Sequence, residues 1–427
     1  MGKSIKPAKA ILCMIIVFAM ILTGCNSERE VEPDATEITK ISSAAGFLAD
    51  KVEGSMGFIA STPKKSKNSE NAYLYDNAVA ILALSYAGAD WHAQKIADAI
   101  LFAQEHDRTF DDGRLRNVYI SGDPKSDSGR SITAGKVTIR LPGFWQDGRW
   151  QEDSYTVSTS TGNIAWTILA LCTVAENATS EQREEYIAAA IRAADFVLTL
   201  KSDSGGFTAG YVGWDDTQEK VTYKSTEHNI NLISAFSALA DLITEQRPEK
   251  AAEYLEASEY AKMFVLSMYD KKLHCFYTGT EEDGKTISKG VIPLDTNTLT
   301  ILALEELEDT HKIISFVEES MTVGEGFDFS AGDLDGIWNE GTAQMAVCYS
   351  KLGHLEKYES IMQYLKTQTD KDGSIPAADR DGVSTGFVIV GTDILWEYNN
   401  SQSIGATGWL AFAQMKKNPL GQNSEQE

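Results

Sequence analysis

The chain alternates between two kinds of apolar segment, and both kinds have helical spacing. One kind is apolar on nearly every side, as in Ile164 to Leu171. The other is striped, with apolar residues every three or four positions and charged residues between them, as in 180–201. A helix that is apolar all round is buried, whereas a striped helix covers a core with one face. The pattern therefore predicts inner helices at 75–88, 162–176, 227–244, 295–308, 340–352 and 402–416, and outer helices at 36–53, 90–106, 180–201, 248–269, 310–322 and 354–369.

The connections between these segments differ strongly in length. An inner helix is joined to the next outer helix by two to five residues, whereas the connections from outer to inner helices run from about 17 to about 55 residues. All the long connections therefore lie at one rim, where the inner helices begin, and long ordered loops are where function concentrates. A closed ring is the simplest way to bury six apolar helices in one chain. We predict an all-α fold, an (α/α)6 toroid of six helical hairpins over residues 40–419, followed by a polar tail at 420–427.

The amino-terminal segment has the pattern of a lipoprotein signal peptide. Residues 1–24 contain three lysines, no acidic residue and an apolar run from 10 to 22, which ends in Leu22-Thr23-Gly24-Cys25. That run is shorter than the roughly 20 residues that a membrane-spanning helix needs. We expect cleavage after Gly24, lipidation of Cys25 and a tether over 25–39. The protein would be exported and held by its lipid anchor on the outer membrane or on the outer face of the cell membrane.

Charge and cysteine content narrow the choice of ligands. The net charge is −24, and removal of the three lysines in 1–24 would make it −27. Such an acidic chain is a poor partner for nucleic acid, so we expect a neutral or weakly charged ligand. Cys172, Cys275 and Cys348 are too widely spaced for a disulfide framework or a zinc site. We expect no metal, no cofactor and a monomer.

Four acidic residues open inner helices at the rim: Asp76, Glu227, Asp295 and Glu340. Helix starts on one ring point toward a common centre. Carboxylates crowded there would have different pKa values, which is the separation that acid and base catalysis at a glycosidic bond requires. The alternative is helix capping, since acidic side chains are favoured in first turns by the helix dipole. The sequence leaves both interpretations open. If the residues are catalytic, we favour Glu227 as acid and Asp76 as base.

The neighbours of these acids and the aromatic residues of the long loops are candidate sugar-binding residues. His228 and Asn229 could orient a sugar hydroxyl or the acid itself, although a buried histidine is often satisfied by a structural hydrogen bond. Sugar rings pack on aromatic faces, but large aromatic residues also anchor long loops. The expected substrate-binding residues are Tyr75, Asn77, Trp145, Trp150, Trp166, Trp214, His228, Asn229, Trp338 and Trp396, and Tyr155, Tyr211 and Tyr398 lie in the same loops.

The twelve-helix pattern, the Tyr75-Asp76-Asn77 helix start, glycine turns such as Asp112-Gly113 and the aromatic, acidic rim resemble the six-hairpin glycosidase superfamily. The resemblance covers nearly the whole of 40–419 but matches no single family, so it implies no catalytic pair. Members are typically glycoside hydrolases, many of them inverting. The resemblance therefore implies a surface-anchored glycoside hydrolase that acts, with inversion, on an oligo- or polysaccharide in the toroid cleft.

Three alternatives remain open at this point. Polysaccharide lyases and sugar epimerases also use related toroids, and the protein could be a glycan-binding lipoprotein without activity. A lyase acting on uronic acids would need basic residues, which Arg114, Arg116, Arg140 and Arg149 could supply from the first long loop.

Overall fold

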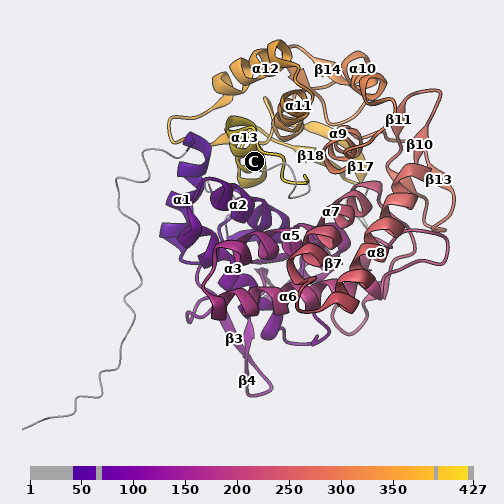
Figure 1. Ribbon diagram of the computed structural model, residues 1–427. Coiled ribbons are helices and arrows are strands. Elements are labelled where there is room, and N and C mark those ends of the chain that lie inside the picture. Colours follow the sequence, from indigo (N-terminus) through magenta and orange to yellow (C-terminus); the bar gives the residue numbers. More distant parts are fainter. Residues whose placement is uncertain (1–41, 64–69, 389–392, 422–427) are drawn as a thin grey trace, which may run out of the picture.

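The computed structural model describes residues 42–63, 70–388 and 393–421 (Figure 1). Twelve long helices form two concentric layers, as the sequence pattern predicted. The inner helices are α2 (Leu74–Tyr86), α5 (Thr161–Asn177), α7 (Thr226–Ile243), α9 (Leu294–Ala303), α11 (Asn339–Lys351) and α13 (Ile404–Met415). The outer helices are α1 (Ser43–Ser55), α3 (Asp90–Glu105), α6 (Ser180–Leu198), α8 (Pro248–Ser267), α10 (Thr310–Met321) and α12 (Leu355–Gln368). The short helix α4 (Ser154–Val157) lies in a rim loop.

The inner helices form a closed ring. Each one packs on the next in chain order, and α13 packs back on α2. Five hairpins join an inner helix to the following outer helix through a short connection, and the sixth pairs α13 with α1 from the other end of the fold. The Gln414 side chain links this last pair, because it accepts a hydrogen bond from Ala44 N at 3.3 Å and donates one to Ser43 Oγ at 3.1 Å. The expected (α/α)6 toroid is confirmed.

Burial explains why the two layers have different sequences. In α2 every residue from Ala78 to Leu84 is fully buried, whereas α6 buries mainly the stripe that contains Tyr186, Ala190 and Ala194. Cys172, Cys275 and Cys348 are free and buried, so they pack as small apolar residues. No helix in the described ranges is both long enough and apolar enough to cross a membrane.

The helix boundaries agree with the prediction to within three residues in all but two places, the end of α9 and the start of α1. Five of the six inner helices begin one residue before the predicted position, and α13 begins at Ile404 rather than 402. The prediction for α9 was wrong at its end. That helix stops at Ala303, and Asp309, with φ 63°, opens the turn into α10. The segment between them is acidic and cannot join the apolar ring. The prediction for the first outer helix was wrong at its start, because α1 begins at Ser43, after the N-cap residue Ser42, and not at 36. The signal peptide, Cys25 and nearly all of the polar tail lie outside the described residues.

The rim loops contain short antiparallel strands that the helical pattern did not predict. They include β1 (Asn71–Tyr73) paired with β2 (Val118–Ile120), and β7 (Thr159–Ser160), β8 (Gly210–Val212) and β9 (Glu219–Lys220) in one sheet. These pairings join loops from different sectors of the ring and hold the rim together. The other strands are β3 (Arg130–Thr133), β4 (Lys136–Ile139), β5 (Phe144–Gln146), β6 (Arg149–Gln151), β10 (Tyr269–Asp270), β11 (Cys275–Phe276), β12 (Gly279–Thr280), β13 (Ile287–Ser288), β14 (Thr322–Val323), β15 (Gly326–Phe327), β16 (Ile375–Pro376), β17 (Val383–Val388), β18 (Leu395–Tyr398) and β19 (Gln402–Ser403).

Candidate active site

The four acidic residues lie in the first turns of four inner helices, as the sequence predicted. Asp76 is on α2, Glu227 on α7, Asp295 on α9 and Glu340 on α11. None of them is the N-cap residue. The N-caps of these helices are Tyr73, Ser225, Pro293 and Trp338. Hydrogen-bond capping by an N-cap side chain therefore does not account for these carboxylates, although all four occupy first turns, where the helix dipole favours acidic side chains.

Gly405, at the start of α13, separates Asp76 from Glu340. A β-carbon at Gly405 would lie 2.7 Å from Asp76 Oδ1 and 2.8 Å from Glu340 Oε2. These two oxygens are therefore at most 5.5 Å apart, the sum of the two distances. Only glycine leaves room at this position for both carboxylates, so α13 helps to bring two acids from its neighbouring helices together.

A hydrogen-bonded chain of aromatic side chains orients Glu340. The Tyr75 hydroxyl donates to Glu340 Oε1 at 2.5 Å, and Trp409 Nε1 donates to the Tyr75 oxygen at 2.8 Å. Trp166 packs edge-on against both rings, with centroid distances of 5.6 Å to Tyr75 and 5.9 Å to Trp409. This packing fixes the Tyr75 ring, and with it the orientation of the carboxyl group.

The four carboxyl groups share one electrostatic environment. Burial raises the pKa of Asp76 to about 7, although a hydrogen bond from Ser61 opposes the shift. Burial also raises the pKa of Glu340 to about 8, and the charges of the other three acids add to the shift while the Tyr75 hydrogen bond opposes it. Burial and the charge of Glu227 raise the pKa of Asp295 well above its usual range. Several of these groups therefore keep protons near neutral pH, as acid catalysis requires.

Glu227 and His228 form the other part of the site. Asn231 Nδ2 donates to Glu227 Oε1 at 3.0 Å, and His228 Nε2 lies 3.9 Å from Glu227 Oε2. His228 packs closely on Gly162 of α5, where a β-carbon would lie 2.4 Å from the imidazole Cδ2. Burial lowers the pKa of His228, and the charge of Glu227 only partly opposes this. The imidazole is therefore neutral at neutral pH and is available as a base or as a hydrogen-bonding group.

Two tyrosines from the rim loops complete the site. Burial raises the pKa of Tyr398 well above its usual range, and the charges of Glu340, Asp295, Glu227 and Asp76 add to the shift. Burial similarly raises the pKa of Tyr155, with contributions from Asp76 and Glu227. Tyr398 stacks on Trp338 at a centroid distance of 5.5 Å, and Trp396 packs edge-on against Tyr155 at 5.5 Å.

Several predicted substrate-binding residues have structural contacts instead. Asn77 is fully buried, and its amide pairs with both the N–H and the carbonyl of Ile59. Asn229 is also fully buried and makes the same pair of bonds to Phe207. Each asparagine thus fastens a rim loop to the start of an inner helix. Trp166 and Trp338 are 1% and 2% exposed. We therefore assign these four side chains a supporting role.

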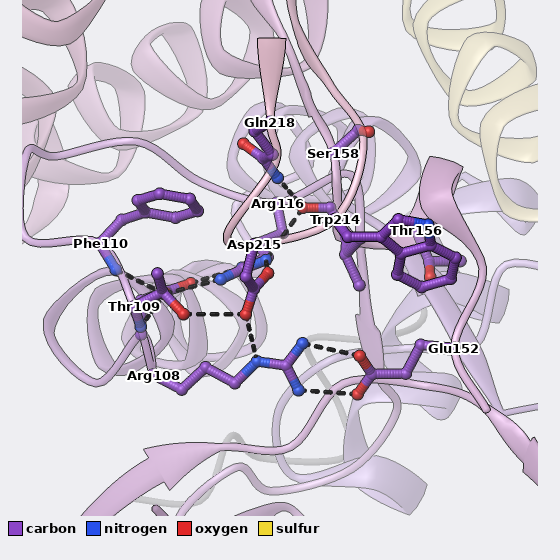
Figure 2. Close-up of polar contacts among 12 residues, drawn as sticks. Arg108, Thr109, Phe110, Arg116, Glu152, Thr156, Ser158, Trp214, Asp215 and Gln218 are labelled. Carbon is purple, nitrogen blue, oxygen red and sulfur yellow. Dashed lines mark hydrogen bonds and ion pairs between the residues drawn. The ribbon is translucent and has the colours of Figure 1, made fainter. Parts of the chain in front are cut away.

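The other predicted tryptophans divide into two groups. Trp145 and Trp150 contact each other on the β5–β6 hairpin at 5.8 Å, and Trp145 is 71% exposed. Trp214 lies beside an ion-pair network (Figure 2). In the described part of the chain, the aromatic residues associated with the four acids include Tyr73, Tyr75, Tyr155, Tyr398 and, through its contact with Tyr155, Trp396. Sequence reasoning missed Gly405 and Trp409, because the sequence around them shows only the pattern of an apolar inner helix.

The ion-pair network joins the rim loop before α5 to the rim loop before α7. Figure 2 shows Arg108 paired with both oxygens of Glu152 and, through Nε, with Asp215. Arg116 is fully buried and paired with Asp107 and Asp215. It also donates to the Val157 carbonyl at 3.0 Å. The network therefore fixes the segment that leads from Glu152 past Tyr155 into α5.

A second acidic cluster lies in the loop before α11. Oxygens of Asp328, Asp333 and Asp335 lie within 4.8 Å of one another, a spacing that could hold a cation. Asp328 is fully buried and accepts hydrogen bonds from Phe329 N and Asp335 N. Burial raises its pKa to about 7, with a contribution from the charges of Asp335 and Asp333. The carboxylate of Asp328 thus already accepts hydrogen bonds from two backbone N–H groups.

Comparison with solved structures shows where else this fold occurs. A glycosidase in complex with glucose matches with a TM-score of 0.60 and 12% identity, over 91% of this chain and 100% of that chain. A D-mannose isomerase matches with a TM-score of 0.59 and 11% identity, over 90% and 99% of the two chains. A cellobiose 2-epimerase from Bacillus thermoamylovorans matches with a TM-score of 0.57 and 11% identity, over 89% and 97%.

These matches show that the chain shares its (α/α)6 toroid fold with these enzymes, as the resemblance seen in the sequence implied. No protein-family model matches the sequence. The search of curated proteins also found no match.

Proposed function

We propose that the protein is a glycoside hydrolase that acts on a neutral or weakly charged oligo- or polysaccharide. The observation that carries the proposal is the gathering of four carboxyl groups at the inner-helix starts, where burial raises the pKa values of Asp76, Asp295 and Glu340 and the charges of neighbouring acids add to the shifts of Asp295 and Glu340. A glycosidic bond needs a protonated acid on one side and a carboxylate on the other. The three structural neighbours named above are sugar-processing enzymes by name, and this agrees with the proposal.

We assign the general acid to Glu340, because its pKa of about 8 keeps it protonated at neutral pH and Tyr75 holds it in place. Glu227 is the base, since its side chain is 30% exposed and water reaches it. Glu340 protonates the leaving oxygen, and Glu227 takes a proton from the water whose oxygen bonds to the anomeric carbon. The sequence favoured Glu227 as acid and Asp76 as base, and that assignment remains the alternative.

The spacing of the acids bears on the stereochemistry. Inverting enzymes need about 6.5 to 9.5 Å between the two carboxyl groups, whereas about 5 to 5.5 Å is typical of retention. The closest oxygens of Asp76 and Glu340 fall within 5.5 Å, which leaves that pair no room for an inverting water. Glu227 and Glu340 stand on helices separated by α9 in the ring. We propose inversion through this pair, and NMR of the first-formed anomer tests it.

A second candidate is a sugar epimerase or isomerase, and His228 is the observation that favours it. A neutral imidazole beside Glu227 could remove a proton from a sugar carbon. A polysaccharide lyase has less support. Arg116 is buried in ion pairs, and Arg114 pairs with Asp112, so neither is available to neutralise a uronate.

One set of incubations separates these functions. We would incubate the protein with a panel of neutral and acidic oligo- and polysaccharides and follow three signals. New reducing ends without ultraviolet absorbance support the hydrolase. Absorbance of an unsaturated uronide indicates a lyase, and deuterium exchange from solvent into an intact sugar indicates an epimerase or isomerase. Retention on a glycan without turnover indicates a binding protein.

We also propose that Cys25 carries a lipid anchor that holds the protein, as a monomer, at the cell surface. The support is the lipobox-like Leu22-Thr23-Gly24-Cys25, which lies outside the described residues. Replacement Cys25→Ser should abolish metabolic labelling with palmitate and release the protein from membranes. Labelling that persists in this variant would overturn the proposal.

A further inference from the structure

We propose that strand β18 forms a roof over the acidic site and restricts the enzyme to chain ends and short oligosaccharides. The inference rests on the proposed hydrolase function and specifies its substrate class. The roof consists of residues 395–398, which belong to the long loop between α12 and α13.

The side chains of β18 alternate between the site and solvent. Tyr398 stacks at 5.5 Å on Trp338, the N-cap residue of α11, whose first turn carries Glu340, and the charges of the four acids contribute to the raised pKa of Tyr398. Trp396, two positions earlier in the strand, packs edge-on against Tyr155 at 5.5 Å. Leu395 is 45% exposed, and Glu397 is exposed as well. Because successive strand residues point to opposite faces, this pattern places one face of β18 over the acids and the other in solvent.

Three other rim loops hold the roof in place. On one side, Trp396 packs on Tyr155 in the loop before α5. On the other side, the paired strand β17 reaches the loop before α11, where Ser384 N donates to Asp335 Oδ2 at 3.1 Å and Phe387 packs edge-on against Phe329 at 6.2 Å.

The third contact is with the loop before α9. A β-carbon at Gly386 would lie 3.1 Å from Val291 Cγ2, so β17 approaches this loop closely. The hairpin is thus fastened to sectors on both sides of α13, and it is held as part of the rim.

This arrangement limits how a glycan can enter. A polymer bound through its middle would have to run between β18 and the acids, where Tyr398 and Trp396 already lie. A chain end needs only one open side, and Glu227 and His228, with side chains 30% and 17% exposed, are accessible there. The substrate class is therefore the end of a glycan chain, or a short oligosaccharide, from which a small sugar is released at each cleavage.

The test compares linear oligosaccharides with cyclic ones of the same sugar and linkage, which have no ends, together with the matching polymer. The wild type should hydrolyse the linear substrates, leave the cyclic ones intact, and release one small product from the polymer while its viscosity falls slowly. Trp396→Ala, which removes the contact with Tyr155, should give internal fragments and gain at least tenfold in cleavage of cyclic substrates. Leu395→Ala, on the solvent face of the same strand, is the matched control and should keep the wild-type pattern.

Rapid cleavage of cyclic substrates by the wild type, or a broad range of internal fragments from the start, would contradict the proposed role of the roof. Neither result would contradict the hydrolase function. A protein that produces no reducing ends from any substrate would instead contradict the proposed function itself, and the roof proposal with it.

Discussion

Tyr75 and Glu340 lie 265 positions apart in the sequence, yet the tyrosine hydroxyl donates a hydrogen bond to Glu340 Oε1 at 2.5 Å. The ring closure makes this possible, because α2 and α11 both flank α13. Trp409 on α13 completes the chain by donating to the tyrosine oxygen. Three inner helices thus combine to hold one protonatable acid.

Replacing Tyr75 with phenylalanine tests this relationship. The hydrogen bond from Tyr75 lowers the pKa of Glu340. In the pH profile of kcat/KM, loss of this bond should therefore shift the alkaline limb from its expected position near pH 8 to a higher pH. We expect kcat/KM to fall by up to about tenfold, since the hydrogen bond that holds the protonated acid in place contributes about 0.5 to 1.5 kcal/mol. Tyr86→Phe, at the far end of the same helix, is the control. An unchanged alkaline limb in Tyr75→Phe would contradict the role given to Tyr75.

The raised pKa values also predict how stability depends on pH. In the folded protein Asp76 and Glu340 have pKa values of about 7 and about 8, whereas an unfolded chain releases these protons near pH 4. Between about pH 4 and pH 8 the folded state therefore binds more protons than the unfolded state. The contribution of these two acids to the free energy of unfolding is complete below about pH 4 and is lost as the pH rises to about 8. Calorimetry should give a lower Tm at pH 8 than at pH 5. The double variant Asp76→Asn with Glu340→Gln should show a smaller difference, and an equal difference would count against these shifts.

Gly405 should not tolerate a side chain. A methyl group there would approach both Asp76 Oδ1 and Glu340 Oε2 to less than 3 Å, so the acids would have to move apart. We expect Gly405→Ala to lose at least tenfold in kcat, because catalysis depends on the placement of these groups. Gly46→Ala in outer helix α1, where a β-carbon meets nothing within 4 Å, is the matched control. Full activity in Gly405→Ala would show that the close approach of the two acids is not needed.

The buried ion pairs of Arg116 should be important for stability. Removing Arg116 leaves the buried Asp107 side chain without its cation and Asp215 with Arg108 alone, and breaking a buried pair typically costs about 3 to 5 kcal/mol. Denaturant unfolding of Arg116→Met should show a loss of this size. Arg130→Met breaks an exposed pair with Asp127 and should change the free energy of unfolding by about 1 kcal/mol or less. Similar effects for the two variants would contradict the structural role of the network.

The fold could be predicted from the sequence because helical periodicity and loop length are local signals. The six inner-helix starts, and with them Asp76, Glu227, Asp295 and Glu340, followed directly from these signals. The rim strands could not be predicted, since most of them are two to four residues long, and the pairs β1–β2, β7–β8 and β16–β19 join segments distant in sequence. A two-residue strand has no periodicity to detect.

The contacts within the site were equally inaccessible to sequence reasoning. Asn77 and Asn229 stood next to acids and looked like ligand-binding residues, but their amides satisfy the backbone of neighbouring loops. Gly405 and Trp409 carried no signal, because their importance comes from what α2 and α11 place beside them. Such contacts depend on which helices become neighbours when the ring closes, and a local sequence pattern does not indicate this.

The most direct test of the central claim is the hydrolysis of oligosaccharides by Glu340→Gln beside the wild type. The wild type should produce new reducing ends without ultraviolet absorbance. The amide variant should lose on the order of a hundredfold or more in turnover while keeping its fold by circular dichroism, because the change is nearly isosteric and removes proton transfer. Glu318→Gln, on outer helix α10, should retain full activity. Reducing ends formed equally fast by wild type and Glu340→Gln, or by none of the proteins, would contradict the account.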